Sequence, residues 1–371
     1  MSKAIGATVL AALIGLTGYA TYTSYVDKKT ETQKIQQENE IITINGLISL
    51  DVEDFFNDSR VIDILKKEKI SVNFKKVGSR DMPDQLMSQS YDFAFPSGVV
   101  AGNKIKEALK VKNIDYSDMN LFYSPMIIGS YQDTADILVA NSIASNQGNN
   151  IYVLDMSKLI PLIKDKKKWS DLKDNSHYNF NKSILVYTTD IKKSNSSAMY
   201  LALASYIENG NDVVTDNITA EKIATTMTGL YKRQGYQENY VSGNFDDYKQ
   251  GVGKSPLAFI YEFQMYRYAM TNKKLKSGMV VMYPSPTIVN KEVFISLTKS
   301  GKKLSDLLNT HSQLQAIAVE YGFRTNSDSN SFIKAAQRNG LNLQEEIKNQ
   351  IDPPSFDIMK TMINTVTTQL N

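Results

Sequence analysis

LVYTTDIKKSNSSAMYLALASY, residues 185–206, is the most informative stretch of this sequence. It begins with an apolar run typical of a strand, passes through small hydroxyl and amide residues, and ends in a strongly apolar helix. A helix that begins in this way directs unpaired backbone N–H groups and its positive dipole end at whatever lies in front of it, which suits an oxyanion or another acceptor-rich ligand. Ser194, Asn195 and Ser196 would equally serve as ordinary helix caps, and the sequence leaves both interpretations open.

Strands and helices alternate along the rest of the chain from Ile41 onward. A β-rich apolar run at 41–48 precedes a segment at 51–67 whose apolar residues have helical spacing, and a second series of such pairs follows residue 150. This alternation predicts an α/β fold with mostly parallel strands and helices on both faces. A chain of 371 residues exceeds the length at which one core usually divides, so we expect two lobes.

Two extended, apolar, proline-containing segments, 121–131 and 278–289, bracket the second series of elements. Crossings of this kind can form a hinge between two lobes, although both segments could equally be ordinary core strands. With the hinge interpretation, residues 41–125 and 290–371 form lobe 1 and residues 126–289 form lobe 2.

The N-terminal residues differ in kind from the rest. No charged residue occurs from Ala4 to Val26, which is enough apolar helix to cross a bilayer. We therefore expect residues 1–26 to be a transmembrane signal anchor and the polar residues 27–40 to be a tether. Lysines lie on both flanks of the segment, and their balance does not fix which side of the membrane the body faces. Small residues flanking Tyr19 would also permit cleavage by a signal peptidase, which makes a secreted protein the alternative.

Composition and motifs argue against several function classes. The net charge of +3 is small for this length, so no nucleic-acid partner is expected. The chain has no cysteine, and its two histidines, His177 and His311, lie in no familiar catalytic motif. No metal or cofactor pattern is present either. A carboxylate pair such as Asp51 and Glu262 across a cleft could do acid–base work, but we predict that the chain is not an enzyme.

The body from residue 41 to residue 324 resembles the type II periplasmic solute-binding proteins, and among them the phosphate- and molybdate-binding branch. Three segments in the expected order carry this resemblance. They are KWSDL at 168–172, which looks like a K-W-S/N-D element; the strand 185–188 with Asp190 and residues 194–197, similar to an R-x-D-x-S-G-T loop; and 123–128, which looks like the first hinge crossing.

The resemblance implies a two-lobed binding protein that captures a small polar solute, with an oxyanion as one candidate, for transport or sensing. The resemblance also implies that the body lies on the periplasmic or outer side of a bacterial inner membrane. An ABC permease or a membrane sensor would then be its partner. The chain departs from the pattern at Asn195-Ser196-Ser197, where the anion-binding proteins carry Ser-Gly-Thr. Acidic residues at 51, 53 and 54 would also repel an anion unless their side chains point away.

Ligands of open α/β sheets lie beyond the carboxyl ends of the strands, so we expect several strand–helix junctions to converge on one cleft. Arg80 is our candidate for pairing with an anionic group, and a surface ion pair with Asp81 or Asp84 is its alternative. The full set of expected ligand-binding residues is Ser49, Arg80, Ser97, Gly98, Ser124, Ser194, Asn195, Ser196, Ser197, Tyr261 and Glu262.

A second function class stays open beside solute binding. The chain could be a membrane-anchored interaction, assembly or sensor protein that uses the binding-protein fold without transport. Residues 356–370 carry apolar side chains at helical spacing after Asp352-Pro353-Pro354. An exposed stripe there would favour a protein partner, whereas a helix packed on lobe 1 would not.

Overall fold

The computed structural model describes residues 41–176, 178, 181–325 and 329–370, together with Tyr25 and Lys28. The expected anchor and tether, apart from those two residues, and His177 lie outside the described residues. None of the described helices combines the length and the apolarity that crossing a bilayer would need.

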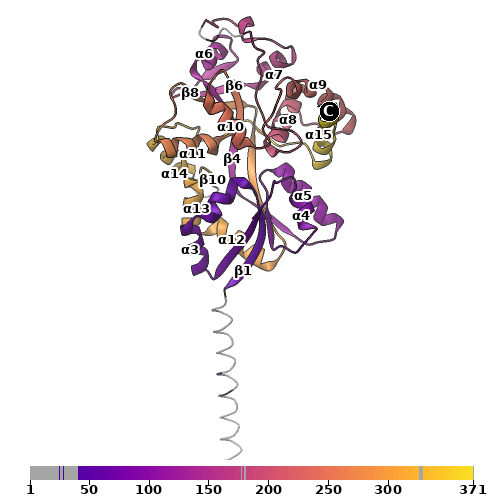
Figure 1. The fold of residues 1–371 in the computed structure, drawn as a ribbon, viewed down its shortest axis with the longest axis vertical. Helices are drawn as coiled ribbons and strands as arrows, with labels where there is room; N and C mark the ends of the chain where they lie inside the picture. Colours follow the sequence, from indigo (N-terminus) through magenta and orange to yellow (C-terminus); the bar gives the residue numbers. More distant parts are fainter. Residues whose placement is uncertain are drawn as a thin grey trace, which may run out of the picture.

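The described residues form two α/β lobes, one above the other in Figure 1. In lobe 1, β1 (Ile42–Ile48) lies between β2 (Ile70–Lys76) and β3 (Phe93–Phe95), and it is parallel to both. Strand β3 also pairs antiparallel with β9 (Thr287–Ser296). The alternation of strands and helices therefore predicted the class of lobe 1 correctly, with the antiparallel β9 as an addition.

Lobe 2 is built around β4 (Ser117–Tyr131), β7 (Leu257–Tyr261) and β8 (Met279–Ser285). Strand β4 pairs antiparallel with both β7 and β8. Beyond β8 the sheet continues with β6 (Ile151–Asp155), which is parallel to β8, and β5 (Ala144–Asn146), which is antiparallel to β6. The expected strand at 184–188 is an extended segment joined to β7 by a single bridge at Tyr187.

The long strands β4 and β9 pass between the lobes, visible as the strands that cross the middle of Figure 1. The first part of β4 pairs with β9, and its last residues pair with β7 and β8. A register shift between Asn120 and Phe122 interrupts the β4–β9 ladder. The segment expected as the first crossing is thus part of β4, and the second contains the turn from β8 to β9.

Helices cover both sheets. On lobe 1 these are η1 (Leu50–Val52), α2 (Glu53–Asn57), α3 (Ser59–Lys67), α4 (Met82–Leu86), α5 (Val99–Val111), α12 (Lys299–Thr310) and α13 (Ser312–Glu320). On lobe 2 they are α6 (Gln132–Ala140), α7 (Met156–Lys164), η2 (Trp169–Asp171), α8 (Asn195–Glu208), α9 (Asn217–Lys232), α10 (Val241–Gln250) and α11 (Glu262–Asn272). The expected helix over 51–67 is interrupted at Asp58, whose side chain caps α3.

The C-terminal residues return to lobe 2. Helix α14 (Ser329–Arg338) stacks Phe332 on Tyr266 of α11, and α15 (Phe356–Leu370) packs along α9 and α8 and also touches α5. The apolar stripe of α15 is buried in these contacts. The sequence places all of 290–371 in lobe 1, whereas these two helices lie against lobe 2; the short strands β10 (Arg324–Thr325) and β11 (Gln350–Ile351) pair with β4 and β9.

Candidate functional site

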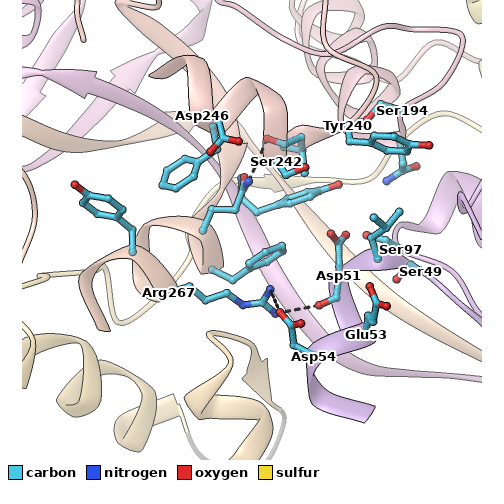
Figure 2. Close-up of a pocket in the computed structure, with 18 of the residues that line it drawn as sticks. Ser49, Asp51, Glu53, Asp54, Ser97, Ser194, Tyr240, Ser242, Asp246 and Arg267 are labelled. Atoms are coloured by element: carbon cyan, nitrogen blue, oxygen red, sulfur yellow. Dashed lines mark hydrogen bonds and ion pairs between the residues drawn. The ribbon is translucent and has the colours of Figure 1, made fainter. Parts of the chain in front are cut away.

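A cavity of about 620 Å³ lies between the two lobes. Lobe 1 contributes residues 49–54 from the β1–α2 junction, the turn at Gly78 and Ser79, and Ser97 after β3. Lobe 2 contributes the start of α8 and residues along the length of α10 and α11. Figure 2 shows these side chains converging from the two sides. The rule that ligands lie beyond the carboxyl ends of strands thus describes where this cavity is.

Five of the residues expected at the site line this cavity: Ser49, Ser97, Ser194, Asn195 and Tyr261. All five are buried, and the hydroxyl of Ser49 and the carbonyl oxygen of the Asn195 side chain have no hydrogen-bond partner. A buried polar atom without a partner is destabilising unless water or a ligand satisfies it. Unpaired polar groups therefore reach the cavity from both lobes.

Ser196, Ser197 and Ser124 are buried behind the cavity and are not among its lining residues. The Ser196 hydroxyl bonds those of Thr189 and Ser194 at 2.7 and 2.9 Å. The Ser197 carbonyl accepts a bond from Tyr231 of α9. Ser124 on β4 accepts the backbone N–H of Phe263, at the start of α11.

Arg80 does not line the cavity, and among the described residues it forms no ion pair with Asp81 or Asp84. Its guanidinium donates to the backbone carbonyl of Ile191, which belongs to the loop before α8. The backbone carbonyl of Arg80 accepts a bond from Lys104 of α5. The side chain thus bridges lobe 1 to lobe 2 outside the cavity.

Glu262 is fully buried away from the cavity, in an ion pair with Arg324. The two carboxylate oxygens accept bonds from Nε and Nη2 of Arg324 at 2.7 and 2.9 Å, and Tyr283 donates a further bond. Because this carboxylate is fully engaged, it cannot form the acid–base pair with Asp51 that the sequence suggested.

The carboxyl group that does approach Asp51 belongs to Glu292, on β9. Burial raises the pKa of Asp51, and burial together with the nearby Asp51 raises the pKa of Glu292 well above its ordinary value. The Ser97 hydroxyl donates to Glu292 Oε1 at 2.9 Å and also lies within hydrogen-bonding reach of Asp51. Asn290 Nδ2 donates to the same Glu292 oxygen at 2.8 Å.

Sequence reasoning missed Glu292 and Asn290, although the strand that holds them carried a signal. In the strand TIVNKEVFIS, Asn290 and Glu292 are two positions apart and therefore share one face, opposite to that of Lys291. A buried carboxyl group on such a face requires hydrogen-bond partners, and Glu292 has them in Ser97 and Asn290.

Gly98 allows the two lobes to approach closely at this point. Its φ is +93°, and a Cβ here would lie 1.9 Å from the side-chain nitrogen of Asn195. The same Asn195 nitrogen donates to Asn290 Oδ1 at 3.2 Å. Gly98 thus holds the start of α5 against the start of α8, a positioning role next to the cavity rather than a place in its lining.

Aromatic rings and one arginine complete the wall of the cavity. Tyr261 stacks on Phe263 with ring centroids 5.1 Å apart. Arg267 lies over the Phe263 ring, and its N–H groups donate to the backbone carbonyls of Asp51 and Tyr321 at 2.9 and 2.7 Å. This arginine therefore joins α11 of lobe 2 to lobe 1, and two of its donors are already used.

A metal cluster is not apparent: among the residues that the structure describes, no three His, Cys, Asp or Glu side chains are grouped to hold an ion. Nor does any family model or any curated protein match the sequence.

Solved structures, however, match over nearly their whole length. The sulfate-binding protein SubI from Mycobacterium tuberculosis has a TM-score of 0.51 at 13% identity, covering 89% of this chain and 99% of that one. The ferric binding protein from Campylobacter jejuni has a TM-score of 0.52 at 11% identity, covering 88% and 99%. A structure described as an ABC transporter from Clostridium perfringens has a TM-score of 0.53 at 13% identity, covering 88% and 100%.

This chain has the fold of the type II periplasmic solute-binding proteins. The resemblance seen in the sequence is thereby confirmed for the fold. At these identities the likeness concerns the fold alone, because unrelated ligands are bound by proteins that share it.

Proposed function

We propose that this chain is an extracytoplasmic solute-binding protein that captures a small polar solute between its two lobes. The observation that carries this proposal is the interlobe cavity, into which both lobes direct buried polar atoms without partners. Its volume is in the range of about 300–1,000 Å³ that is typical of small-molecule sites. The matching solved structures support it, since two of them are described as binding sulfate and ferric iron.

The rest of the proposal concerns location and partners. The charge-free segment 4–26 would anchor the protein in the inner membrane, with the body on the periplasmic or extracellular side, unless it is cleaved and the body secreted. An ABC permease or a membrane sensor would respond to the loaded form. We propose a binding role without catalysis. The alternative of a pure interaction protein has less support, because the stripe on α15 that would have favoured it is buried.

A thermal-shift screen of the full-length chain in detergent tests the proposal. The panel contains oxyanions, primary amines, amino acids and sugars. A solute at about 100 times its Kd stabilises the native state by about 2.7 kcal/mol, which is several degrees of melting temperature. A panel that leaves the melting temperature unchanged in every class would contradict solute binding.

Closure of the lobes is measured separately. Because the chain has no cysteine, Asp84→Cys and Lys222→Cys place one exposed label on each lobe without background labelling. Energy transfer between the labels should rise when the stabilising solute is added. The same labels on one lobe, at Asp63 and Asp84, provide the control that should not respond.

A further inference from the structure

Arg80 joins the two lobes at one side of the cavity, next to Ser79 and Lys193, which line it. Its half-buried guanidinium donates to the backbone carbonyl of Ile191, in the turn that leads into α8. The side chain comes from lobe 1 and the carbonyl from lobe 2. This bond therefore exists only while the lobes are in contact.

Both ends of the bond are held by their own lobes. On lobe 1, the backbone carbonyl of Arg80 accepts a bond from Lys104 Nζ of α5 at 2.7 Å. On lobe 2, the Ser194 N–H donates to the Asp190 carbonyl at 2.9 Å, which closes the turn that contains Ile191. Because each end is fixed to its lobe, a movement of one lobe away from the other has to break the bond.

The charges around Arg80 support the contact from both lobes. Burial lowers the pKa of Arg80, and the charges of Asp81 on lobe 1 and Asp190 on lobe 2 oppose that shift. The guanidinium is thus attracted to both lobes at once. A hydrogen bond from a charged donor is about twice as strong as one between neutral groups, and it is stronger still where water is partly excluded.

A second arginine joins the lobes on the other side of the cavity. Arg267 of α11 donates to backbone carbonyls of lobe 1, and Figure 2 shows it on the side opposite to Ser194 and Ser97. The cavity therefore lies between two arginine contacts. Both contacts are made by protein groups alone, so they favour the closed form, in which the lobes are in contact, before any solute enters.

We propose that Arg80 is an interlobe latch, whose bond to the Ile191 carbonyl shifts the solute-free protein toward the closed form. This inference rests on the proposed function only in assuming that the lobes open and close. Arg80 does not line the cavity, so it acts as a positioning residue and not by touching a solute. A solute that binds the closed form gains apparent affinity in proportion to the population of that form.

Energy transfer within the full-length chain in detergent tests the latch without any solute. Asp63→Cys on α3 and Lys222→Cys on α9 place one exposed label on each lobe, outside both the cavity and the turn of Arg80. Arg80→Met removes the donors of the latch. The loss of a charged hydrogen bond should shift the ratio of closed to open form by about tenfold or more toward the open form, which lowers the transfer. Unchanged transfer in Arg80→Met overturns the proposal.

Arg233→Met is the matched control. Arg233 is also half-buried, and its N–H groups donate to the backbone carbonyls of Gly229 and Ile163, but all three residues belong to lobe 2. Its replacement should lower the melting temperature and leave the transfer as in the unchanged chain. An equal fall in transfer in the two variants would overturn the latch, because the loss of any half-buried arginine would then separate the lobes.

Arg80→Gln is the second variant if Arg80→Met does not fold, which its melting curve shows. Glutamine keeps a polar end but is neutral and shorter, so the transfer should again fall, and unchanged transfer there overturns the latch. The transfer is measured without solute, whereas the proposed function is tested by the solute screen. Either inference can therefore fail while the other stands.

Discussion

Two buried carboxyl sites differ in how they are completed. Glu262 is enclosed by protein groups: Arg324 pairs with both of its oxygens and Tyr283 donates a third bond. Glu292, next to Asp51, has only hydroxyl and amide groups as hydrogen-bond partners, and one of its oxygens has none; the charge of Arg267 acts on both carboxyl groups without forming an ion pair with either among the described residues. In the first site, which we call the closed site, protein groups neutralise the charge of Glu262 and satisfy its oxygens, as in structural ion pairs; the site of Glu292 and Asp51 is called the open site. The second is incomplete and lies next to the cavity, which Asp51 and Ser97 line, as ligand sites do.

This difference between the sites predicts that mutations lower the free energy of unfolding by unequal amounts, and we expect the largest fall at Glu262, in the closed site. Arg324→Met would leave Glu262 buried without a counter-charge, which should lower the free energy of unfolding by about 3–5 kcal/mol. Chemical denaturation measures the change. Adding Glu262→Gln to Arg324→Met should recover part of the loss, because the uncompensated charge is then removed. A fall of less than about 1 kcal/mol in the single variant would mean that the closed site is not stabilised by this pair.

The next effect concerns how the open site is positioned. Gly98→Ala would bring a Cβ into the Asn195 side chain at a positive φ, and both strain and overpacking should lower the free energy of unfolding by about 2–4 kcal/mol. Gly148→Ala is the matched control, since Gly148 has φ +86° but open space around it. The free energy of unfolding should fall less in Gly148→Ala, and that smaller fall measures the backbone strain without the overpacking. Equal losses in the two variants would mean that the contact with Asn195 does not contribute to the loss in Gly98→Ala.

Sequence periodicity and strand–helix order were sufficient for the fold class, because each element carries its own apolar pattern. They also located Ser49 and Ser97 after the parallel strands β1 and β3, whose carboxyl ends lie together. On lobe 2, Ser194 follows an extended segment and Tyr261 ends a strand that is antiparallel to β4, so the parallel-sheet rule does not account for them. The Trp169 of the KWSDL segment proved to be core, fully buried against Tyr178.

What could not be predicted is the orientation of individual side chains. Nothing local in the sequence indicates that Arg80 reaches the carbonyl of Ile191, 111 positions away, or that Glu262 is paired with Arg324 rather than with the cavity. Glu292 lies 241 positions from Asp51, and the antiparallel pairing of β3 with β9 brings them together. Such contacts depend on the three-dimensional packing of the two lobes.

Titration provides a subtler distinction between the two sites. Burial raises the pKa of Glu292 well above its ordinary value of 4.5, which it regains on unfolding. Between those two values the native state binds more protons than the unfolded state, so the free energy of unfolding falls as pH rises. The groups facing Glu292 include Asp51, Ser97, Asn290, Arg267 and Tyr261.

Glu292→Gln removes this titrating group and should flatten the fall by up to about 1.4 kcal/mol per pH unit. Denaturation curves collected at successive pH values measure the slope. Glu53→Gln changes the charge equally and should keep the slope, because Glu292 is still present. An unchanged slope in Glu292→Gln would mean that Glu292 is ionised in the native state as readily as in the unfolded chain, and the site would then resemble the closed one.

The smallest effect is expected where a carboxylate of the cavity is paired in solvent. Asp246 binds Lys249 at 2.6 Å, but its side chain is 65% exposed. Exposed pairs of this kind contribute about 0–1 kcal/mol, so Asp246→Asn should change the free energy of unfolding by less than about 1 kcal/mol. The change should shrink further in 1 M salt, which screens exposed charges, whereas the loss in Arg324→Met should persist because that pair is buried. A large, salt-independent loss at Asp246 would mean that exposure does not separate the two kinds of carboxylate, and the contrast between the closed and the open site would need another cause.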